Sequence, residues 1–313
     1  MAKLERGMME DLIFERDIKD EDVVLGPKYG EDAAVLKVGD EFLVAHSDPI
    51  SGAVENIGWL ALNIAANDIA VCGASPRWAL PSLQFPDAHP KEEIKKVILD
   101  LYEASVDLDI DIIGGHSEMI DGIDHPLVTT TMMGTTEEPI FTAESKPEDK
   151  IVQIGEVGIE GTWILACDFE NGLRKNGVDE EIIQRAKGLE KKISVVDPAL
   201  EIRDKVSSMH DPTEGGILQG LYEMAQASNK KYVIDSDPLM MDETRKITKR
   251  LGIDPLRLIS SGCLLATVPE NFELERGKVI GEVKEGGPTV EFKGEEVEEI
   301  KEDELFRAAR SLR

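Results

Sequence analysis

The feature that most constrains this chain is a helical segment with almost no polar face. Residues 56–71 are apolar on nearly every side and are interrupted only by Asn56, Asn63, Asn67 and Asp68. A helix that is apolar all round must be covered by other elements, so we expect it inside a layered structure. Buried amides and carboxylates need hydrogen-bond partners or a metal ion. The three asparagines lie within about 40° of one line on the helix; the alternative, an exposed polar stripe, would usually carry Lys and Glu.

The segments before residue 139 alternate between strands and helices. Residues 33–38 and 41–45, joined by Gly39-Asp40, predict a β-hairpin. Further strands are predicted at 78–85, 110–113 and 127–133, and an amphipathic helix from Lys91. The first 25 residues are polar and acidic and predict a short helix or an arm.

The second half of the chain repeats this alternation after a stretch rich in Glu, Ser, Lys and Pro at 139–149. Strands are predicted at 151–154, 232–235 and 263–268, and helices at 162–169, 180–190, 198–206 and 212–227. Residues 279–300 predict short strands with an acidic turn. A length of 313 residues fits two cores. We therefore predict an α/β (α+β) fold with two domains, 1–145 and 146–313.

The charge balance excludes some classes of partner. The chain has 35 basic and 63 acidic residues, a net charge of −28, which repels nucleic acid and anionic membranes. We find no apolar run of the ~20 residues that a membrane helix needs and no signal peptide at the start, so we expect a cytoplasmic protein. Three widely separated cysteines, Cys72, Cys167 and Cys263, are expected to be small core residues. Any phosphate ligand would need a divalent cation to bridge it to the carboxylates.

Carboxylates stand at both ends of the predicted hairpin. Asp32 precedes the first strand and Asp48 follows the second, so antiparallel pairing brings them to the same edge of the sheet. Two carboxylates at one edge repel each other unless they share a cation, and Mg²⁺ prefers such oxygen ligands. Asp32 alone is more typical of a turn than of a ligand site.

Two glycine-containing loops suggest places where a ligand approaches the backbone. Asp211 before Pro212 is a capping signature, but Gly215-Gly216 at the start of a helix costs about 1 kcal/mol per glycine. Helix N-termini also favour anions. Gly114-Gly115-His116 follows a predicted strand in a similar way; His116 by itself is more typical of a hydrogen-bonded loop residue than of a ligand.

Taken in order, five motifs resemble one family. They are Gly30 to Leu36 (GEDAAVL), Ser47-Asp48, Asn67 to Pro76 (NDIAVCGASP), Gly114-Gly115, and Asp211 to Gly216 (DPTEGG). The series is similar to the ATP-dependent superfamily of aminoimidazole ribonucleotide synthetase, which includes thiamine-monophosphate kinase, selenophosphate synthetase and the hydrogenase-maturation carbamoyl dehydratase. The dehydratase branch is the most similar, in its Asp-Pro-Thr-x-Gly-Gly form and in residues 251–256 followed by Gly262.

The resemblance implies ATP and Mg²⁺ in a cleft between the domains, and a homodimer in which two N-terminal sheets form a barrel. It implies metal ligands Asp32, Asp48 and Asp68, and catalytic residues Asp211 and Glu214. Nucleotide contacts are implied for Asp32, Ser47, Asn67, Gly114, Gly115, Gly215 and Gly216. The reaction would phosphorylate an oxygen of a small-molecule or carrier-bound amide or phosphate, and a maturation protein is a further expected partner.

Departures from the branch patterns leave alternatives open. The dehydratase carries its substrate on a C-terminal cysteine, whereas no cysteine follows Cys263 here. Glu214 stands at a position where that branch has Arg. Ser261 and Cys263 stand where it has Glu and Lys, and His116 stands where some relatives have Asp. The alternatives are therefore a non-catalytic nucleotide-binding dimer and a thiamine-monophosphate kinase. The acceptor and the choice between Mg²⁺ and Mn²⁺ are not determined by the sequence.

Overall fold

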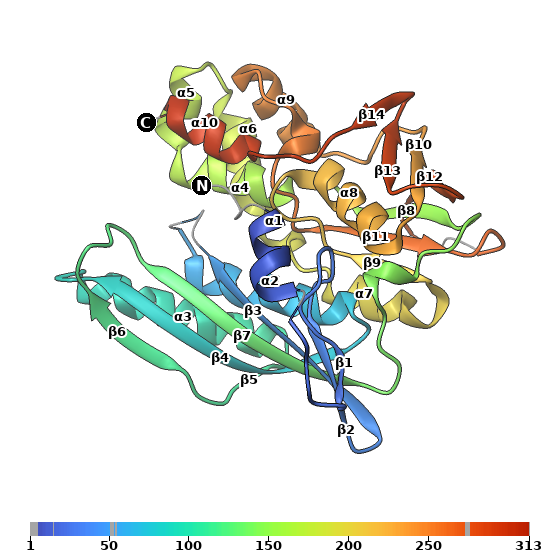
Figure 1. Cartoon of the computed structure of the whole chain (residues 1–313). Helices are drawn as coiled ribbons and strands as arrows, with labels where there is room; N and C mark the ends of the chain where they lie inside the picture. Colours follow the sequence, from blue (N-terminus) through green and yellow to red (C-terminus); the bar gives the residue numbers. More distant parts are fainter. Residues whose placement is uncertain (1–5, 15, 51–52, 54, 273–275, 313) are drawn as a thin grey trace.

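The chain folds around two seven-stranded sheets, each built from a different half of the sequence (Figure 1). The computed structural model describes residues 6–14, 16–50, 53, 55–272 and 276–312. The first sheet uses β1 to β7 and the second uses β8 to β14, with residues 137–149 between them. This confirms the predicted α/β class. The division into domains 1–145 and 146–313 and the pairing of two chains into a barrel stay predictions.

The first sheet has the strand order β1-β2-β3-β7-β4-β5, and β6 also pairs with β4. The predicted hairpin is confirmed, with Ala34 opposite Ala45. The second hairpin strand is longer than predicted and includes Asp48, because β7 pairs with it as far as Ile50. The strands are β1 (Val23–Leu25), β2 (Ala34–Val38), β3 (Glu41–Ile50), β4 (Ser75–Pro86), β5 (Asp111–Ile112), β6 (His116–Ile120) and β7 (Leu127–Thr136).

The apolar helix α2 (Ile57–Val71) lies against one face of this sheet. Every residue of α2 except Trp59 is buried, because β3, β4 and β7 cover one side and α3 (Lys91–Asp107) and α7 (Val196–Ile202) cover others. The sequence expectation of a helix covered all round is confirmed. Since α7 belongs to the second half of the chain, α2 also joins the two halves through one continuous hydrophobic core.

The second sheet has the order β14-β13-β10-β12-β8-β11-β9. Helix α8 (Gly216–Ser228) packs on it through Ile217, Leu221 and Met224. Figure 1 shows a separate helical layer, α4, α5, α6, α9 and α10, above the first sheet. The strands are β8 (Lys150–Gly155), β9 (Ser208–His210), β10 (Lys231–Ile234), β11 (Cys263–Val268), β12 (Lys278–Lys284), β13 (Thr289–Phe292) and β14 (Glu295–Val297).

The remaining helices complete this layer and the connections. They are α4 (Ile159–Asp168), α5 (Glu170–Lys175), α6 (Glu180–Lys187), α9 (Asp242–Leu251) and α10 (Glu304–Leu312), with the short α1 (Arg6–Met9) and a π-turn at Glu10–Phe14. Single 3-10 turns occur at Thr142–Glu144, Gly188–Lys192, Arg203–Lys205 and Pro255–Arg257.

One helix prediction was wrong in its first residue. The helix predicted at 212–227 begins at Gly216, because Gly215 and Gly216 adopt positive φ values that interrupt a helix before them. The helix predicted near 198–206 is confirmed as α7 from Val196 to Ile202, continued by a 3-10 turn at Arg203–Lys205. The acidic turn of the last predicted strands is confirmed as the β13–β14 hairpin.

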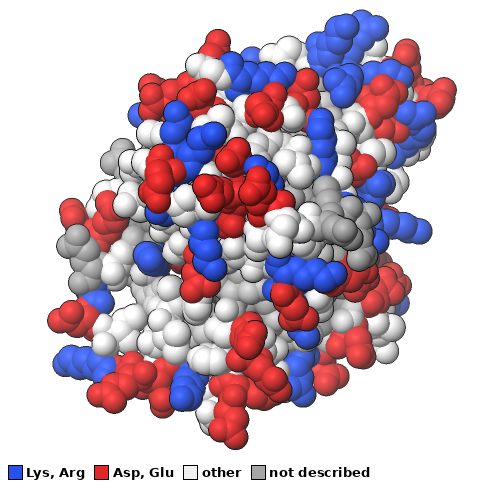
Figure 2. All heavy atoms as spheres, turned by 90° about the vertical axis from the view of Figure 1, so that its right-hand side faces the viewer, with Lys and Arg blue, Asp and Glu red and all other residues white. Residues whose placement is uncertain are grey.

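Among the described residues, no helix is long and apolar enough to cross a membrane. Acidic and basic side chains are interspersed over the face shown in Figure 2. Cys72 and Cys263 are buried as expected, whereas Cys167 is only partly buried.

Candidate functional site

Four predicted carboxylates gather where the two halves of the chain meet. Asp32 precedes β2, Asp48 lies in β3, Asp68 lies in α2 and Asp211 follows β9. Burial raises the pKa of Asp68 well above its usual range, and repulsion by Asp211, Asp48 and Asp32 raises it further. Such mutual repulsion requires that the carboxylates lie near one another. The fold therefore brings together side chains that are up to 179 positions apart, between Asp32 and Asp211.

Asp211 is the member of this group that most lacks hydrogen-bond partners. It is 2% exposed, and neither carboxylate oxygen has a hydrogen-bond partner among the described residues. Burial, and next the negative charge of Asp32, raise its pKa to about 7, while His210 and Asn67 act in the opposite direction. The capping interpretation of Asp211 was wrong, because α8 begins five residues later at Gly216. A buried carboxylate without partners is unstable unless a cation or a proton joins it.

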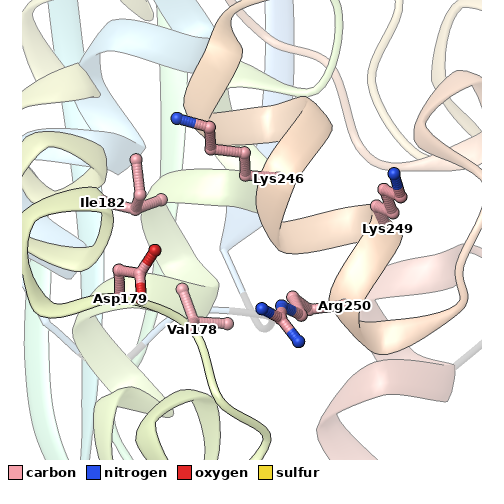
Figure 3. A pocket seen from close by; sticks show the side chains of 6 residues that line it. All are labelled: Val178, Asp179, Ile182, Lys246, Lys249 and Arg250. Carbon is pink, nitrogen blue, oxygen red and sulfur yellow. The ribbon is translucent and has the colours of Figure 1, made fainter.

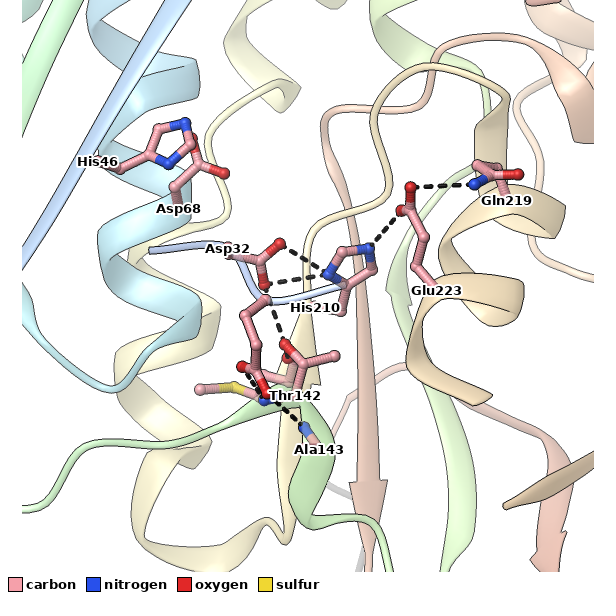
Figure 4. A network of polar contacts seen from close by, with 10 residues as sticks. Asp32, His46, Asp68, Thr142, Ala143, His210, Gln219 and Glu223 are labelled. Atoms are coloured by element: carbon pink, nitrogen blue, oxygen red, sulfur yellow. Dashed lines mark hydrogen bonds and ion pairs between the residues drawn. The ribbon is translucent and has the colours of Figure 1, made fainter. Parts of the chain in front are cut away.

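His210 holds Asp32 in this group, and it was not singled out from the sequence. Figure 4 shows its ring between Asp32 and Glu223. Nδ1 lies 2.8 Å from Asp32 Oδ1, and Nε2 lies 3.1 Å from Glu223 Oε2. Burial by itself lowers the pKa of His210, but the two carboxylates outweigh it and raise the pKa well above its ordinary value. The ring is therefore a buried cation that links the loop before β2 to α8.

Hydrogen bonds extend this link on both sides. Glu223 accepts a hydrogen bond from Gln219, one turn earlier in α8, at 3.0 Å. Glu31 accepts hydrogen bonds from the backbone N–H groups of Thr142 and Ala143 at 2.9 and 3.1 Å. On the other side of the group, Nε2 of His46 in β3 lies 3.4 Å from Asp68 Oδ2. Both halves of the chain thus fix the carboxylates in place.

The asparagine row of α2 has three separate roles. Asn67 accepts a hydrogen bond from the N–H of Val195 at 2.8 Å and donates to the carbonyl of Ile193 at 3.0 Å. Asn63 donates to the carbonyl of Trp59 in its own helix, and Asn56 donates to Glu190. Asn67 therefore joins the halves of the chain, and its predicted contact with nucleotide stays a prediction.

Gly215 and Gly216 are required by packing. Gly215 has φ +82° and donates its N–H to Asp303 Oδ2 at 2.6 Å. A Cβ on Gly216 would lie 2.5 Å from the carbonyl oxygen of Leu256. Packing therefore explains why glycine occupies both positions, which the sequence could not reveal. The predicted contact of these glycines with a nucleotide stays a prediction.

A second buried acidic group lies next to Asp211. Glu160, in the first turn of α4, is 2% exposed, and its Oε2 has no hydrogen-bond partner among the described residues. Burial raises its pKa to about 8; the hydroxyl of Ser261 opposes the shift, and the charges of Asp211, Glu214 and Asp303 add to it. Burial also raises the pKa of Asp303 to about 6. The predicted catalytic residue Glu214 therefore lies near Asp211, Glu160 and Asp303. An isolated Glu in an apolar segment, such as Glu160, is the only sequence signal that could have indicated this group.

The Gly114-Gly115 loop lies away from the carboxylates within one chain. Both glycines are exposed, and Gly115 packs on the carbonyl of Pro81 in β4. The strands β4 and β7 separate this loop from Asp48 in β3. Ser47 is exposed on the sheet and its hydroxyl lies 3.0 Å from that of Thr131. The predicted contacts of Ser47, Gly114 and Gly115 with a nucleotide stay predictions.

The carboxylates do not form a closed metal site by themselves. In the part of the chain that the structure describes, no three His, Cys, Asp or Glu side chains lie close enough together to hold a metal ion. The unpartnered oxygens of Asp211 and the repulsion around Asp68 nevertheless fit a divalent cation in their donor chemistry.

Comparison with known proteins defines the class. The model of the N-terminal domain of AIR synthase related proteins matches residues 30–136, and the model of their C-terminal domain matches residues 146–293. The chain belongs to the AIR synthase related family, which confirms the predicted relationship.

Several known proteins are similar to this chain. A Methanocaldococcus jannaschii protein described as a hydrogenase expression/formation protein is 29% identical over 96% of this chain and 92% of its own length. The carbamoyl dehydratase of Rhizobium leguminosarum is 27% identical over 70% of this chain, and the match spans 62% of the dehydratase. The thiamine-monophosphate kinase of Pyrococcus abyssi is 23% identical over 87% of both chains. The family is thus one of enzymes.

Solved structures show the same fold at lower identity. AaThiL complexed with AMPPCP and TMP has a TM-score of 0.76 at 19% identity, and covers 95% of this chain and 94% of its own. A hydrogenase maturation protein HypE in complex with ATP has a TM-score of 0.68 at 19% identity, over 94% of this chain and 90% of its own. The two-sheet arrangement described above is therefore that of this family.

Proposed function

We propose that this chain uses Mg-ATP to phosphorylate an oxygen of a small-molecule or carrier-bound substrate. The observation that carries the proposal is the buried Asp211, whose two oxygens make no hydrogen bond among the described residues and whose pKa is raised by burial and by the charges of Asp32 and Asp48. Relatives of this fold that were solved with ATP or AMPPCP support the choice of nucleotide. On a chain of net charge −28, a phosphate group needs a cation between itself and the carboxylates.

Asp32, Asp48 and Asp68 would hold the cation, and Asp211 would lie near the transferred phosphoryl group. Mg²⁺ commonly uses one or two carboxylates and completes its shell with phosphate oxygens and water, which fits a site that protein side chains leave open. When bound, it would neutralise charge on the transferred phosphoryl group. His210 keeps Asp32 in position. Burial of Asp68 and Asp211 excludes water and strengthens every charge interaction with the ligand.

A homodimer is part of the proposal. The face of the first sheet opposite α2 carries the partly exposed apolar side chains of Leu43, Trp78, Leu80 and Met133. A second copy would cover this surface. Leu80→Glu should convert a dimer into a monomer in sedimentation velocity, and an unchanged sedimentation coefficient would contradict this. One relative of this fold was solved as a HypE–HypF complex, which supports testing a maturation protein as a further partner.

The proposed use of Mg-ATP is tested by calorimetric titration of ATP with Mg²⁺ and then with EDTA. We expect binding that requires the metal and that is lost in Asp68→Asn. The matched control is Asp87→Asn, which neutralises an exposed carboxylate in the loop after β4. Equal binding in both variants, or binding that survives EDTA, would remove the carboxylate site from the proposal.

Turnover separates an enzyme from a nucleotide-binding module. An enzyme should release phosphate from ATP slowly even without its acceptor, and Asp211→Asn should lower this rate about 100-fold while ATP remains bound. Binding without any turnover would instead favour a non-catalytic partner protein. Addition of thiamine monophosphate tests the kinase alternative directly, since that reaction would consume ATP in proportion to the added compound.

A further inference from the structure

A hollow between α6 and α9 carries the opposite charge to the carboxylate site. Its volume is about 470 Å³, within the range of small-molecule pockets. Figure 3 shows the side chains that line it, with Lys246, Lys249 and Arg250 on α9 and Val178, Asp179 and Ile182 on a neighbouring segment. Val178 and Ile182 are buried, while the charged side chains are exposed around them. The hollow thus has an apolar floor and a mainly cationic rim.

The cations of this rim are only partly compensated. Lys246 pairs with Asp242 at 2.7 Å, but neither Lys249 nor Arg250 has an ion-pair partner among the described residues. Lys246 is three residues from Lys249 and four from Arg250, a spacing at which like charges repel on a helix. A chain with 63 acidic residues has nevertheless kept three cations here. Favourable interaction with the C-terminal end of α9 accounts for Lys249 and Arg250 on the helix, but not for their position around a hollow.

The acidic member of the rim defines the ligand further. Asp179 is the N-cap residue of α6, yet its side chain makes no capping hydrogen bond. Its carboxylate is therefore available to accept a hydrogen bond from a ligand. Even with Asp242 counted as the partner of Lys246, the cations of the rim outnumber the carboxylates, which suits an anion that also bears a hydroxyl or N–H donor. The buried side chains of Val178 and Ile182 would contact the carbon skeleton of such a ligand.

We propose that the hollow between α6 and α9 is a binding site for a small phosphate monoester. Arg250 and Lys249 bind the phosphate, Lys246 adds positive charge, and Asp179 accepts a hydrogen bond from the remainder of the molecule. Helix α4 packs against both α6 and α9, and its first turn carries Glu160 beside Asp211. This site does not depend on the proposed use of ATP.

The test is calorimetric titration of the full chain with ribose 5-phosphate in EDTA and low salt. Without a divalent cation the carboxylate site repels phosphate, so any binding of ribose 5-phosphate in EDTA reports on the hollow alone. Failure of this binding and failure of Mg-ATP binding at the carboxylates are therefore separate results. We expect wild-type binding and a loss of about tenfold in affinity in Arg250→Gln, because a charge-assisted hydrogen bond is removed. Lys249→Gln should weaken binding in the same direction.

The matched control is Arg245→Gln, which makes the same change of charge on an exposed residue of α9 that does not line the hollow. It should bind as the wild type does. Equal affinity in Arg245→Gln and Arg250→Gln would overturn the site, as would no binding by the wild type up to about 10 mM. Malate binding as tightly as ribose 5-phosphate would overturn the assignment to phosphate. Because all three side chains are exposed, unchanged thermal unfolding should show that the variants are folded.

Discussion

The carboxylate site and the hollow between α6 and α9 hold their charges in different ways. Asp68, Asp211 and Glu160 are buried at or near the junction of the two halves, whereas Lys249 and Arg250 are exposed near the end of one helix. Removing a charged group from water costs several kcal/mol, and an exposed charge costs almost nothing. A change of charge in the buried site therefore alters the stability of the whole fold, whereas a change of charge at the exposed site has almost no effect on stability.

The largest effect is expected at His210, on the buried side of this comparison. His210→Leu would leave Asp32 and Glu223 as buried charges without their common partner. We expect the free energy of unfolding at pH 7 to fall by about 3–5 kcal/mol, as measured by urea denaturation. His116→Leu, on the exposed β6, is the control and should change stability by no more than about 0.5 kcal/mol. Similar losses in the two variants would show that His210 is not a buried cation.

The next effect concerns pH. The pKa of Glu160 is raised from 4.5 to about 8, chiefly by burial, so the folded state retains a proton that the unfolded state releases between these values. The stabilisation that this residue provides is therefore fully present at low pH and is lost as pH rises through this window, on the order of 4 kcal/mol. Asp211, with its pKa raised to about 7, acts in the same direction.

Glu160→Gln isolates this contribution, because an amide of nearly the same shape does not titrate. We expect denaturation measured from pH 5 to pH 8 to show a shallower loss of stability in the variant than in the wild type. The exposed Glu103→Gln is the control and should retain the wild-type slope. A wild-type stability that rises over this range would contradict the burial of an unpaired acid.

A smaller effect is expected for Gly115→Ala, and it distinguishes a packing role of Gly115 from contact with a nucleotide. A Cβ there would lie 2.2 Å from the carbonyl oxygen of Pro81, and φ is +144°. Gly115→Ala should therefore lower stability by about 1–3 kcal/mol in thermal unfolding. Gly122→Ala is the control, because Gly122 also has a positive φ but has no atom near its Cβ position. Loss of ATP binding in Gly115→Ala with unchanged stability would favour the predicted nucleotide contact over packing.

The smallest effect on stability is expected at the exposed hollow. Arg250→Gln removes a cation without an ion-pair partner among the described residues, so unfolding should change by no more than about 0.5 kcal/mol in urea denaturation. A loss of several kcal/mol would mean that Arg250 supports the fold, and the contrast between the buried and exposed sites would fail.

The sequence predicted the carboxylates of the site more completely than their partners. Asp32, Asp48, Asp68 and Asp211 were found because polar side chains next to apolar segments are conspicuous. His210, Glu160 and Asp303 were missed, because a single polar residue gives no local sign that distant segments will surround it. Asn67 was found for a correct reason, a buried amide that needs partners, but those partners are the backbone groups of Ile193 and Val195.

By itself the sequence determined the elements that depend on local pattern: the hairpin at β2 and β3, the buried helix α2 and the amphipathic helix α3. Only the tertiary structure decided which groups share a site. It placed β7 beside Asp48, His210 between Asp32 and Glu223, and α9 opposite Val178 and Ile182. The physical reason is that periodicity and turn chemistry act over a few residues. Burial, charge repulsion and close packing depend instead on segments that only the folded chain brings into contact.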